Sequence, residues 1–192
     1  SAIIFSLYIT RNTVTSDISA ADQILLNENF NSEIPEEWFP FLNYPRLNEQ
    51  QWYWENGTVK FDPTLGEKEA HDAMFLYSGG YAWKNYTVEA DFSGKHTGIW
   101  FRTHYQESST MGQWVTGYYA AFTYREVRLW KIQTPENCVT DCDKPYYLNH
   151  FSNPTMVTSA PVGTQSGRAK IVLNGDSIKI YINNSLALEA ND

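Results

Sequence analysis

Two carboxylates, Glu89 and Asp91, are spaced so that they could share acid–base chemistry. They alternate with apolar residues, so a strand at residues 86–92 places both carboxylates on one face. Hydrolysis of a glycosidic bond with retention needs two carboxyl groups about 5–5.5 Å apart, one of which serves as acid and base. No acid/base partner accompanies this pair. We therefore expect a solvated strand face here and no catalytic residue.

The histidines, cysteines and glycines do not indicate a metal or a cofactor. Four histidines lack a partner at metal-ligand spacing: His71, His96, His104 and His150. No phosphate-binding, dinucleotide-binding or nucleophile-elbow motif is present. Cys138 and Cys142 are too few and too close for a four-ligand zinc site, and we expect them to form a local disulfide in an oxidising compartment. The sequence thus predicts no metal, no cofactor and no enzymatic activity.

Aromatic residues supply another kind of chemistry, because their rings stack on sugar rings and anchor interfaces. They make up 16% of the chain, which is dense enough to need an explanation. One explanation is cross-strand packing within a β-sandwich. The other is a sugar-stacking face, for which the candidates are Trp100, Trp114, Tyr118, Tyr119 and Trp130.

Glycosylation signals and charge point to the compartment and exclude some partners. Three Asn-x-Ser/Thr triplets begin at Asn56, Asn85 and Asn183. The formal charge is −8 with no basic cluster, which disfavours nucleic acid and anionic membranes as partners. Ser1 fits a mature chain whose export signal was removed, and the apolar run at residues 2–9 is too short for a membrane helix. We expect a secreted or cell-surface protein with no membrane insertion of the mature chain.

Alternating apolar and polar residues predict strands that position these groups, at residues 58–62, 86–92, 97–103, 115–124, 126–132, 168–173 and 177–182. Asn174-Gly175 is a hairpin signal between the last two strands. Loops are predicted at residues 39–50, 63–72, 105–112 and 135–167, and a helical turn at residues 18–26. Short strands joined by turns indicate an all-β, antiparallel two-sheet sandwich.

Several segments carry a family resemblance: LNENFNSEIPEEW (26–38), WYWENGTVKF (52–61), AWKNYTVEADF (82–92), GIWFRTHY (98–105), GYYAAFTY (117–124) and GRAKIVLNGDSIKIYINN (167–184). In this order they resemble concanavalin A-like, laminin-G-like jelly rolls, in particular the group related to 3-keto-disaccharide hydrolases. The resemblance implies a jelly-roll sandwich and implies fold more than function. Laminarinase-type glycosidases of this fold carry Glu-x-Asp-x-x-Glu on one strand, and Gly94 stands at the third of these positions.

The N-terminal segment precedes the family-like region and alternates strictly. Its apolar face consists of Ile3, Phe5, Leu7 and Ile9, which predicts a strand that buries one side. Domains of the family continue past residues 185–192 with a further strand, so the resemblance implies that one sheet lacks a strand. We predict a donor strand and linker at residues 1–22 and the sandwich at residues 23–192.

The N-terminal strand has two possible destinations, and the remaining alternative is a terminal tail without a structural role. It completes its own domain, or it inserts into the next subunit by donor-strand complementation. Insertion gives a head-to-tail homopolymer, because such a contact does not close on itself. The main functional prediction is therefore a structural subunit of an extracellular filament, a pilus or thread. The alternative is a secreted carbohydrate-binding, lectin-like module whose partners are glycans.

Overall fold

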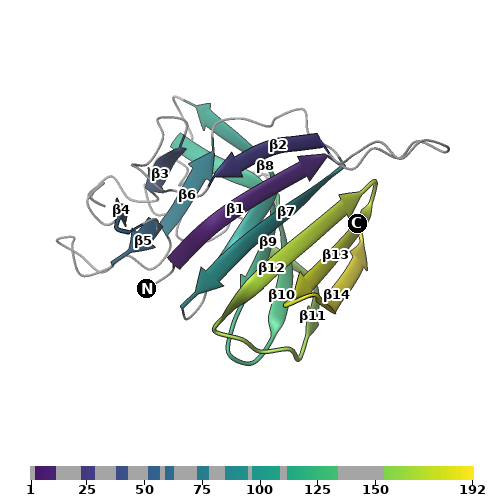
Figure 1. Cartoon of the computed structure of the whole chain (residues 1–192). Coiled ribbons are helices and arrows are strands. Elements are labelled where there is room, and N and C mark those ends of the chain that lie inside the picture. Colours follow the sequence, from purple (N-terminus) through teal and green to yellow (C-terminus); the bar gives the residue numbers. More distant parts are fainter. Residues whose placement is uncertain are drawn as a thin grey trace.

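The structure, a computed structural model, describes residues 3–11, 23–28, 38–42, 52–56, 59–62, 73–77, 85–94, 97–108, 112–133 and 154–192. Every regular element in this part of the chain is a β-strand, and all strand pairs are antiparallel (Figure 1). No helix in it is long and apolar enough to cross a membrane.

The larger sheet has eight strands and carries both ends of the described chain. Its order is β14-β13-β12-β7-β1-β5-β4, with β2 paired to β1. The bounds are β1 Ile3–Arg11, β2 Gln23–Glu28, β4 Trp52–Trp54, β5 Val59–Phe61, β7 Tyr86–Ser93, β12 Ser166–Asn174, β13 Ser177–Ile182 and β14 Ser185–Asn191.

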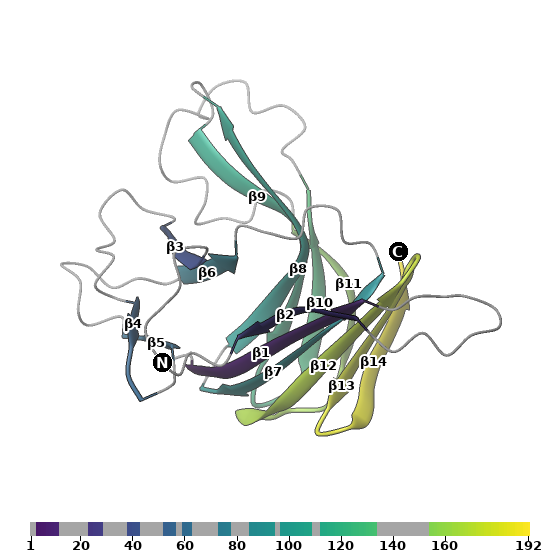
Figure 2. The same cartoon turned by 45° about the horizontal axis from the view of Figure 1, so that its top comes forward.

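A four-stranded sheet packs against the larger sheet, in the order β11-β10-β9-β8. Its strands are β8 Thr97–Ser108, β9 Gly112–Phe122, β10 Val127–Ile132 and β11 Pro154–Ala160. A separate pair consists of β3 Trp38–Leu42 and β6 Ala73–Tyr77. Figure 2 shows the two main sheets as the layers of a sandwich, with the far ends of β8 and β9 projecting beyond it.

The core lies between these sheets and is built from the alternate apolar residues of each strand. Val88, Ile171 and Ile180 of the larger sheet and Phe122 and Leu129 of the smaller one are buried in one cluster. The rings of Phe92 and Phe122 stack across the sheets with centroids 4.7 Å apart. The predicted all-β, antiparallel two-sheet jelly-roll sandwich is confirmed, because alternation with period two leaves each strand one face to bury.

Local sequence sets the turns of the C-terminal meander. The predicted hairpin at Asn174-Gly175 is present, but Asn174 pairs with Ser177, so the central residues of the turn are Gly175 and Asp176. Only Gly175 has a positive φ (56°), in the first central position, where a type II′ turn needs glycine. Positive φ at both central residues occurs instead in the next hairpin, between β13 and β14.

Four local predictions are wrong. The loop expected at residues 39–50 begins with strand, because β3 runs to Leu42. The helical turn expected at residues 18–26 is overridden by β2, because pairing with β1 satisfies its backbone. The loop expected at residues 135–167 contains β11, whose proline stands at its first residue, a position that sheets tolerate. The loop expected at residues 105–112 is mostly strand, since β8 runs on to Ser108.

β1 lies inside the larger sheet of its own chain. It pairs with β7 along its length, from Ile3 opposite Ser93 to Arg11 opposite Tyr86, and with β5 and β2 on its other side. A register shift between Ile4 and Ser6 interrupts the alternation that was predicted. Of the two predicted destinations, the structure has the one in which this strand completes its own domain. Insertion into a neighbouring chain stays a prediction, and the predicted linker at residues 12–22 lies outside the described residues.

Candidate functional site

Three aromatic residues stand side by side across the four-stranded sheet. The register places Trp100 opposite Tyr119, and Tyr119 opposite Trp130. We call these three residues the aromatic row. Met156 of β11 lies opposite Trp130 with an exposed fraction of 51%, so it continues the row to the edge of the sheet.

The row is on the outer face of this sheet. Phe101, Tyr118 and Leu129, each next in sequence to a row residue, are buried in the core. Successive side chains of a strand point to opposite faces, so the row points away from the core. All three row residues are partly exposed. We call this outer surface the aromatic face.

Glycine makes room for the central ring of the row. A Cβ atom built on Gly98 would lie 2.4 Å from Cε2 of Tyr119, so the tyrosine ring covers this glycine. The same ring stacks on Trp100, with centroids 5.0 Å apart and planes inclined by 28°. Offset-stacked pairs of this kind stabilise by about 0.5–1.5 kcal/mol beyond their area burial. The row is therefore held in place before any ligand arrives.

Polar groups flank the row. Arg128, two residues before Trp130 on β10, donates hydrogen bonds from Nε (2.8 Å) and Nη2 (2.5 Å) to Oε1 of Glu126. These bonds lower the pKa of the Glu126 carboxyl, and Ser159 of β11 adds a further hydrogen bond. An apolar row with charged donors and acceptors beside it can bind an amphipathic ligand, stacking its apolar surface and hydrogen-bonding its hydroxyl groups.

One of the predicted sugar-stacking residues, Tyr118, does not join the row. The prediction for Tyr118 is wrong: it points into the core, where its ring stacks on Phe101 with centroids 5.6 Å apart. Neighbours in a strand cannot share a face, so Tyr118 and Tyr119 could not both belong to one binding surface. The backbone of Trp114 lies in β9 opposite Gln106, and its side chain is outside the described part.

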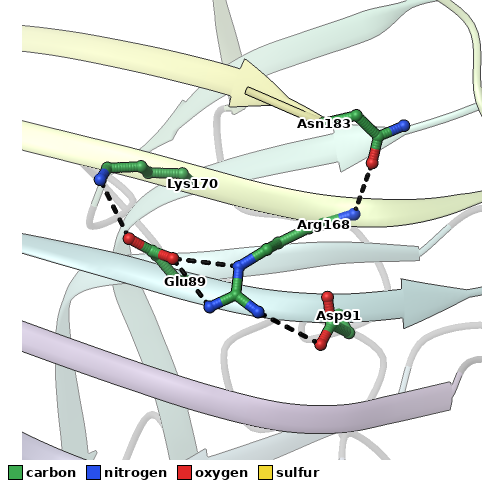
Figure 3. Close-up of polar contacts among 5 residues, drawn as sticks. All are labelled: Glu89, Asp91, Arg168, Lys170 and Asn183. Carbon is green, nitrogen blue, oxygen red and sulfur yellow. Dashed lines mark hydrogen bonds and ion pairs between the residues drawn. The ribbon is translucent and has the colours of Figure 1, made fainter. Parts of the chain in front are cut away.

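The outer face of the larger sheet has a different character, which Figure 3 shows. Arg168 of β12 donates from Nε (3.0 Å) and Nη2 (2.9 Å) to Oε2 of Glu89, while Nζ of Lys170 lies 3.0 Å from Oε1 of the same carboxylate. Nη1 of Arg168 also reaches Oδ2 of Asp91 at 3.5 Å. We call this outer surface the charged face.

The arrangement around Glu89 and Asp91 does not suit acid catalysis. Both carboxylates lie on one face, as predicted. Burial raises the pKa of the Glu89 carboxyl, but hydrogen bonds and charges from Lys170 and Arg168 outweigh burial and lower it. A general acid of a glycosidase needs a raised pKa instead. The pair is thus the centre of an ion-pair network on a sheet surface.

The remaining predicted sites are placed only in part. Cys138 and Cys142, the predicted disulfide, lie outside the described residues. Asn56 and Asn183 are exposed and Asn85 is partly exposed. Within the described part of the chain, no group of three histidine, cysteine or acidic side chains could hold a metal ion.

Comparison with known proteins gives one weak likeness in fold. No protein-family profile matches the sequence, and no curated protein matches it. The carbohydrate binding module CBM66 from Bacillus subtilis is similar in structure, with a TM-score of 0.39 and 16% sequence identity over 62% of this chain. The alignment covers 65% of that module, slightly less than two thirds of its length. A likeness at this level assigns no function to this chain.

Sequence reasoning missed Gly98, Arg128 and Met156 as parts of this surface. Each belongs to it only through the register of β8 to β11, which pairs residues that are far apart in the chain. The alternation along β8, β9 and β10 was a usable signal. It separates Tyr119 from Tyr118 and puts Trp100 and Trp130 in phase with the outward positions of their strands.

Proposed function

We propose that this domain is a secreted carbohydrate-binding module and that the aromatic face is its ligand site. The observation that carries the proposal is the register of the aromatic row on three neighbouring strands, outside the core. The row is not part of the core cluster, which lies on the other face of the sheet. Partly exposed aromatics that gather on one face are typical of binding surfaces.

The chemistry of the face favours sugars over other flat ligands. A pyranose ring has an apolar C–H surface that packs on an indole or phenol ring, and hydroxyl groups at its rim that need donors and acceptors. Arg128 and Glu126 supply such groups next to the row. Nucleic-acid bases also stack on aromatics, but single-stranded nucleic acid needs a basic groove as well. A chain with a formal charge of −8 does not offer this.

A matched pair of tryptophan variants tests the proposal. The full chain is first screened on a glycan array, and the affinity for the best ligand is then measured by calorimetry. Trp130→Ala should weaken binding about 10-fold or more, because one stacking surface contributes at least about 1.4 kcal/mol. Trp54→Ala is the control, since Trp54 is 38% exposed but lies in β4 of the other sheet. An array without ligands, or equal losses in both variants, would contradict the proposal.

A second candidate function is the filament subunit, and it rests on β1. This strand is the first of the described chain, and it lies between β7 on one side and β5 and β2 on the other. Since all its hydrogen-bond partners come later in the sequence, the same strand from another copy could occupy the same place. Such an exchange keeps every backbone hydrogen bond and creates a head-to-tail polymer.

Paired cysteines distinguish the two destinations of β1. Ser6 lies opposite Asp91 in the register, and the Cα separation of antiparallel partners, about 4.5–5.5 Å, suits a disulfide. If strands are exchanged, the double variant Ser6→Cys/Asp91→Cys gives a ladder of linked chains in non-reducing electrophoresis. A monomer with the bond inside one chain, identified by peptide mapping, would contradict the filament.

A further inference from the structure

The three asparagines of the glycosylation triplets all lie beside strands of the eight-stranded sheet. Asn56 follows β4, Asn85 precedes β7 and Asn183 follows β13. None of the triplets lies on the four-stranded sheet that carries the aromatic row. The structure further shows how two of the three side chains are oriented, and this orientation bears on whether they can be modified.

The side chain of Asn183 is fixed with its oxygen toward the sheet. Its Oδ1 accepts a hydrogen bond from the backbone N–H of Arg168 at 2.9 Å, and its own backbone N–H donates to the Arg168 carbonyl at 2.9 Å. Only the oxygen of an amide can meet an N–H donor, so the assignment of Oδ1 and Nδ2 is unambiguous. Gly167 leaves the space for this contact, because a Cβ there would lie 2.7 Å from Oδ1.

The nitrogen of Asn183 is left available. Figure 3 shows Nδ2 pointing away from β12, and no hydrogen bond from Nδ2 occurs within the described part of the chain. The residue is exposed and occupies a two-residue turn with Asn184, with φ values of 48° and 67°. Asparagine tolerates this left-handed backbone better than most residues. The turn can therefore hold Asn183 with Nδ2 pointing away from β12 and does not strain the sheet.

Asn85 repeats the arrangement at the other end of the same strands. Its Oδ1 accepts a hydrogen bond from the backbone N–H of Gly175 at 2.9 Å, in the turn between β12 and β13. The carbonyl of Gly175 in turn accepts a hydrogen bond from the Arg102 guanidinium. No bond from Nδ2 of Asn85 occurs among the described residues either. Both side chains thus have a structural role through the oxygen and leave the nitrogen unused.

We propose that Asn85 and Asn183 carry N-linked glycans, transferred from a lipid-pyrophosphate-linked oligosaccharide. In this reaction Nδ2 forms a bond to the anomeric carbon of the sugar, and the bond from that carbon to the phosphate oxygen breaks. The lipid pyrophosphate leaves with the electron pair, and Nδ2 loses one proton to a base of the transferase. Oδ1 takes no part, so the hydrogen bonds to Arg168 and Gly175 persist in the glycoprotein.

N-linked glycans at these two positions would affect the two faces of the sandwich differently. This holds whether or not the aromatic face binds a carbohydrate ligand. Glycans at Asn85 and Asn183 project from opposite ends of the strands β7, β12 and β13, which carry the charged face. The glycan at Asn183 also stands at the start of β14, the edge strand of the larger sheet. An exposed edge invites pairing with other chains, and a hydrated glycan at its start opposes this.

Site occupancy in secreted protein tests the proposal. The full chain is secreted from a glycosylating eukaryotic host and analysed by intact mass and peptide mapping, with the host's own glycoproteins in the same medium as positive controls. Thr87→Ala and Ser185→Ala keep each asparagine and its hydrogen bond but remove the triplet. We expect each variant to lose the mass of one glycan. Ser185→Ala, at an exposed position, should keep its melting temperature, whereas Thr87→Ala removes a buried hydroxyl group and should melt at a lower temperature. Unmodified peptides around Asn85 and Asn183, in medium whose host proteins are glycosylated, would overturn the proposal.

A second variant separates the two roles of Asn183. Asn183→Asp keeps an oxygen for the Arg168 N–H and cannot be glycosylated, whereas Asn183→Ala loses both. We expect both variants to lack the same glycan mass and only Asn183→Ala to melt at a lower temperature than the Ser185→Ala control. If Asn183→Asp retained the glycan mass, the modified site would be elsewhere and the assignment would be wrong.

Discussion

The two outer faces of this sandwich differ in the interactions that their side chains make. On the charged face, Glu89 is held by Arg168 and Lys170, and Lys179 pairs with Glu189 at 3.1 Å. On the aromatic face, Trp100 stacks on Tyr119, and the ion pair of Arg128 with Glu126 flanks the row. Exposed ion pairs contribute little to stability. The free energy falls when a ligand covers an apolar ring that faces water. The aromatic face is therefore the better candidate for binding.

Truncating the core should break both faces together and has the largest expected effect. Phe122 is fully buried and stacks on Phe92 of the opposite sheet. Phe122→Ala should lower the free energy of unfolding by about 3–5 kcal/mol, because it leaves a cavity at the junction of the sheets. Denaturant unfolding followed by tryptophan fluorescence measures this loss. A change below about 1 kcal/mol would mean that the two sheets do not share this core.

Two glycine variants sharpen the contrast between the faces. Gly98→Ala should displace Tyr119 and reduce stability by about 1–3 kcal/mol, because the new methyl group overlaps both the ring and the backbone carbonyl oxygen of Ala120. Gly175→Ala should cost about 1 kcal/mol through its positive φ alone, since no atom lies within 4 Å of the added carbon. Only Gly98→Ala should weaken glycan binding in calorimetry. If both variants lost glycan affinity equally, the aromatic row would not be the binding site.

Acid should weaken the ion-pair network of the charged face. The folded-state pKa of Glu89 is lowered from 4.5, so its ion pairs stabilise the fold at higher pH and this stabilisation is lost as pH falls through the folded pKa. Between about pH 5 and pH 3 the wild type should lose about 0.5–1 kcal/mol more than Glu89→Gln, given partial screening by solvent. Urea melts across this range measure the difference. Identical pH profiles for the wild type and Glu89→Gln would show that the pairing of Glu89 with Arg168 and Lys170 does not contribute to stability.

The smallest expected effects come from replacing one charged residue of similar exposure on each face. Arg128 and Lys179 each form an ion pair that is partly exposed. Replacing either with alanine should change the free energy of unfolding by less than about 0.5 kcal/mol. Arg128→Ala should nevertheless weaken glycan binding a few-fold, whereas Lys179→Ala should leave it unchanged. The reverse order would place the ligand on the charged face.

Much of the sandwich follows from local pattern. The strands around Tyr86, Val127 and Ile178 were predicted within a residue or two, because each alternates clearly between core and solvent. β11 was not predicted, since the prolines around it suggested a loop. The place of β1 was not decided either, because its partners in β7 are about eighty residues away and no local signal specifies that register.

The candidate site was predicted in the same uneven way. Trp100, Tyr119 and Trp130 were identified as aromatic candidates, but the alternation that removes Tyr118 was not applied to them. These three residues form one row only through two strand registers, which the sequence does not reveal. The oxygen-inward orientation of Asn85 and Asn183 likewise depends on backbone groups of another strand or turn.

The most direct test of the aromatic face is to follow the tryptophan indole N–H signals by nuclear magnetic resonance while a glycan found by the array is added. The account predicts that the signals of Trp100 and Trp130 shift with the same dissociation constant and that the signal of Trp54, on the other sheet, stays in place. Shifts confined to Trp54, or a bound glycan that leaves Trp100 and Trp130 unmoved, would contradict it.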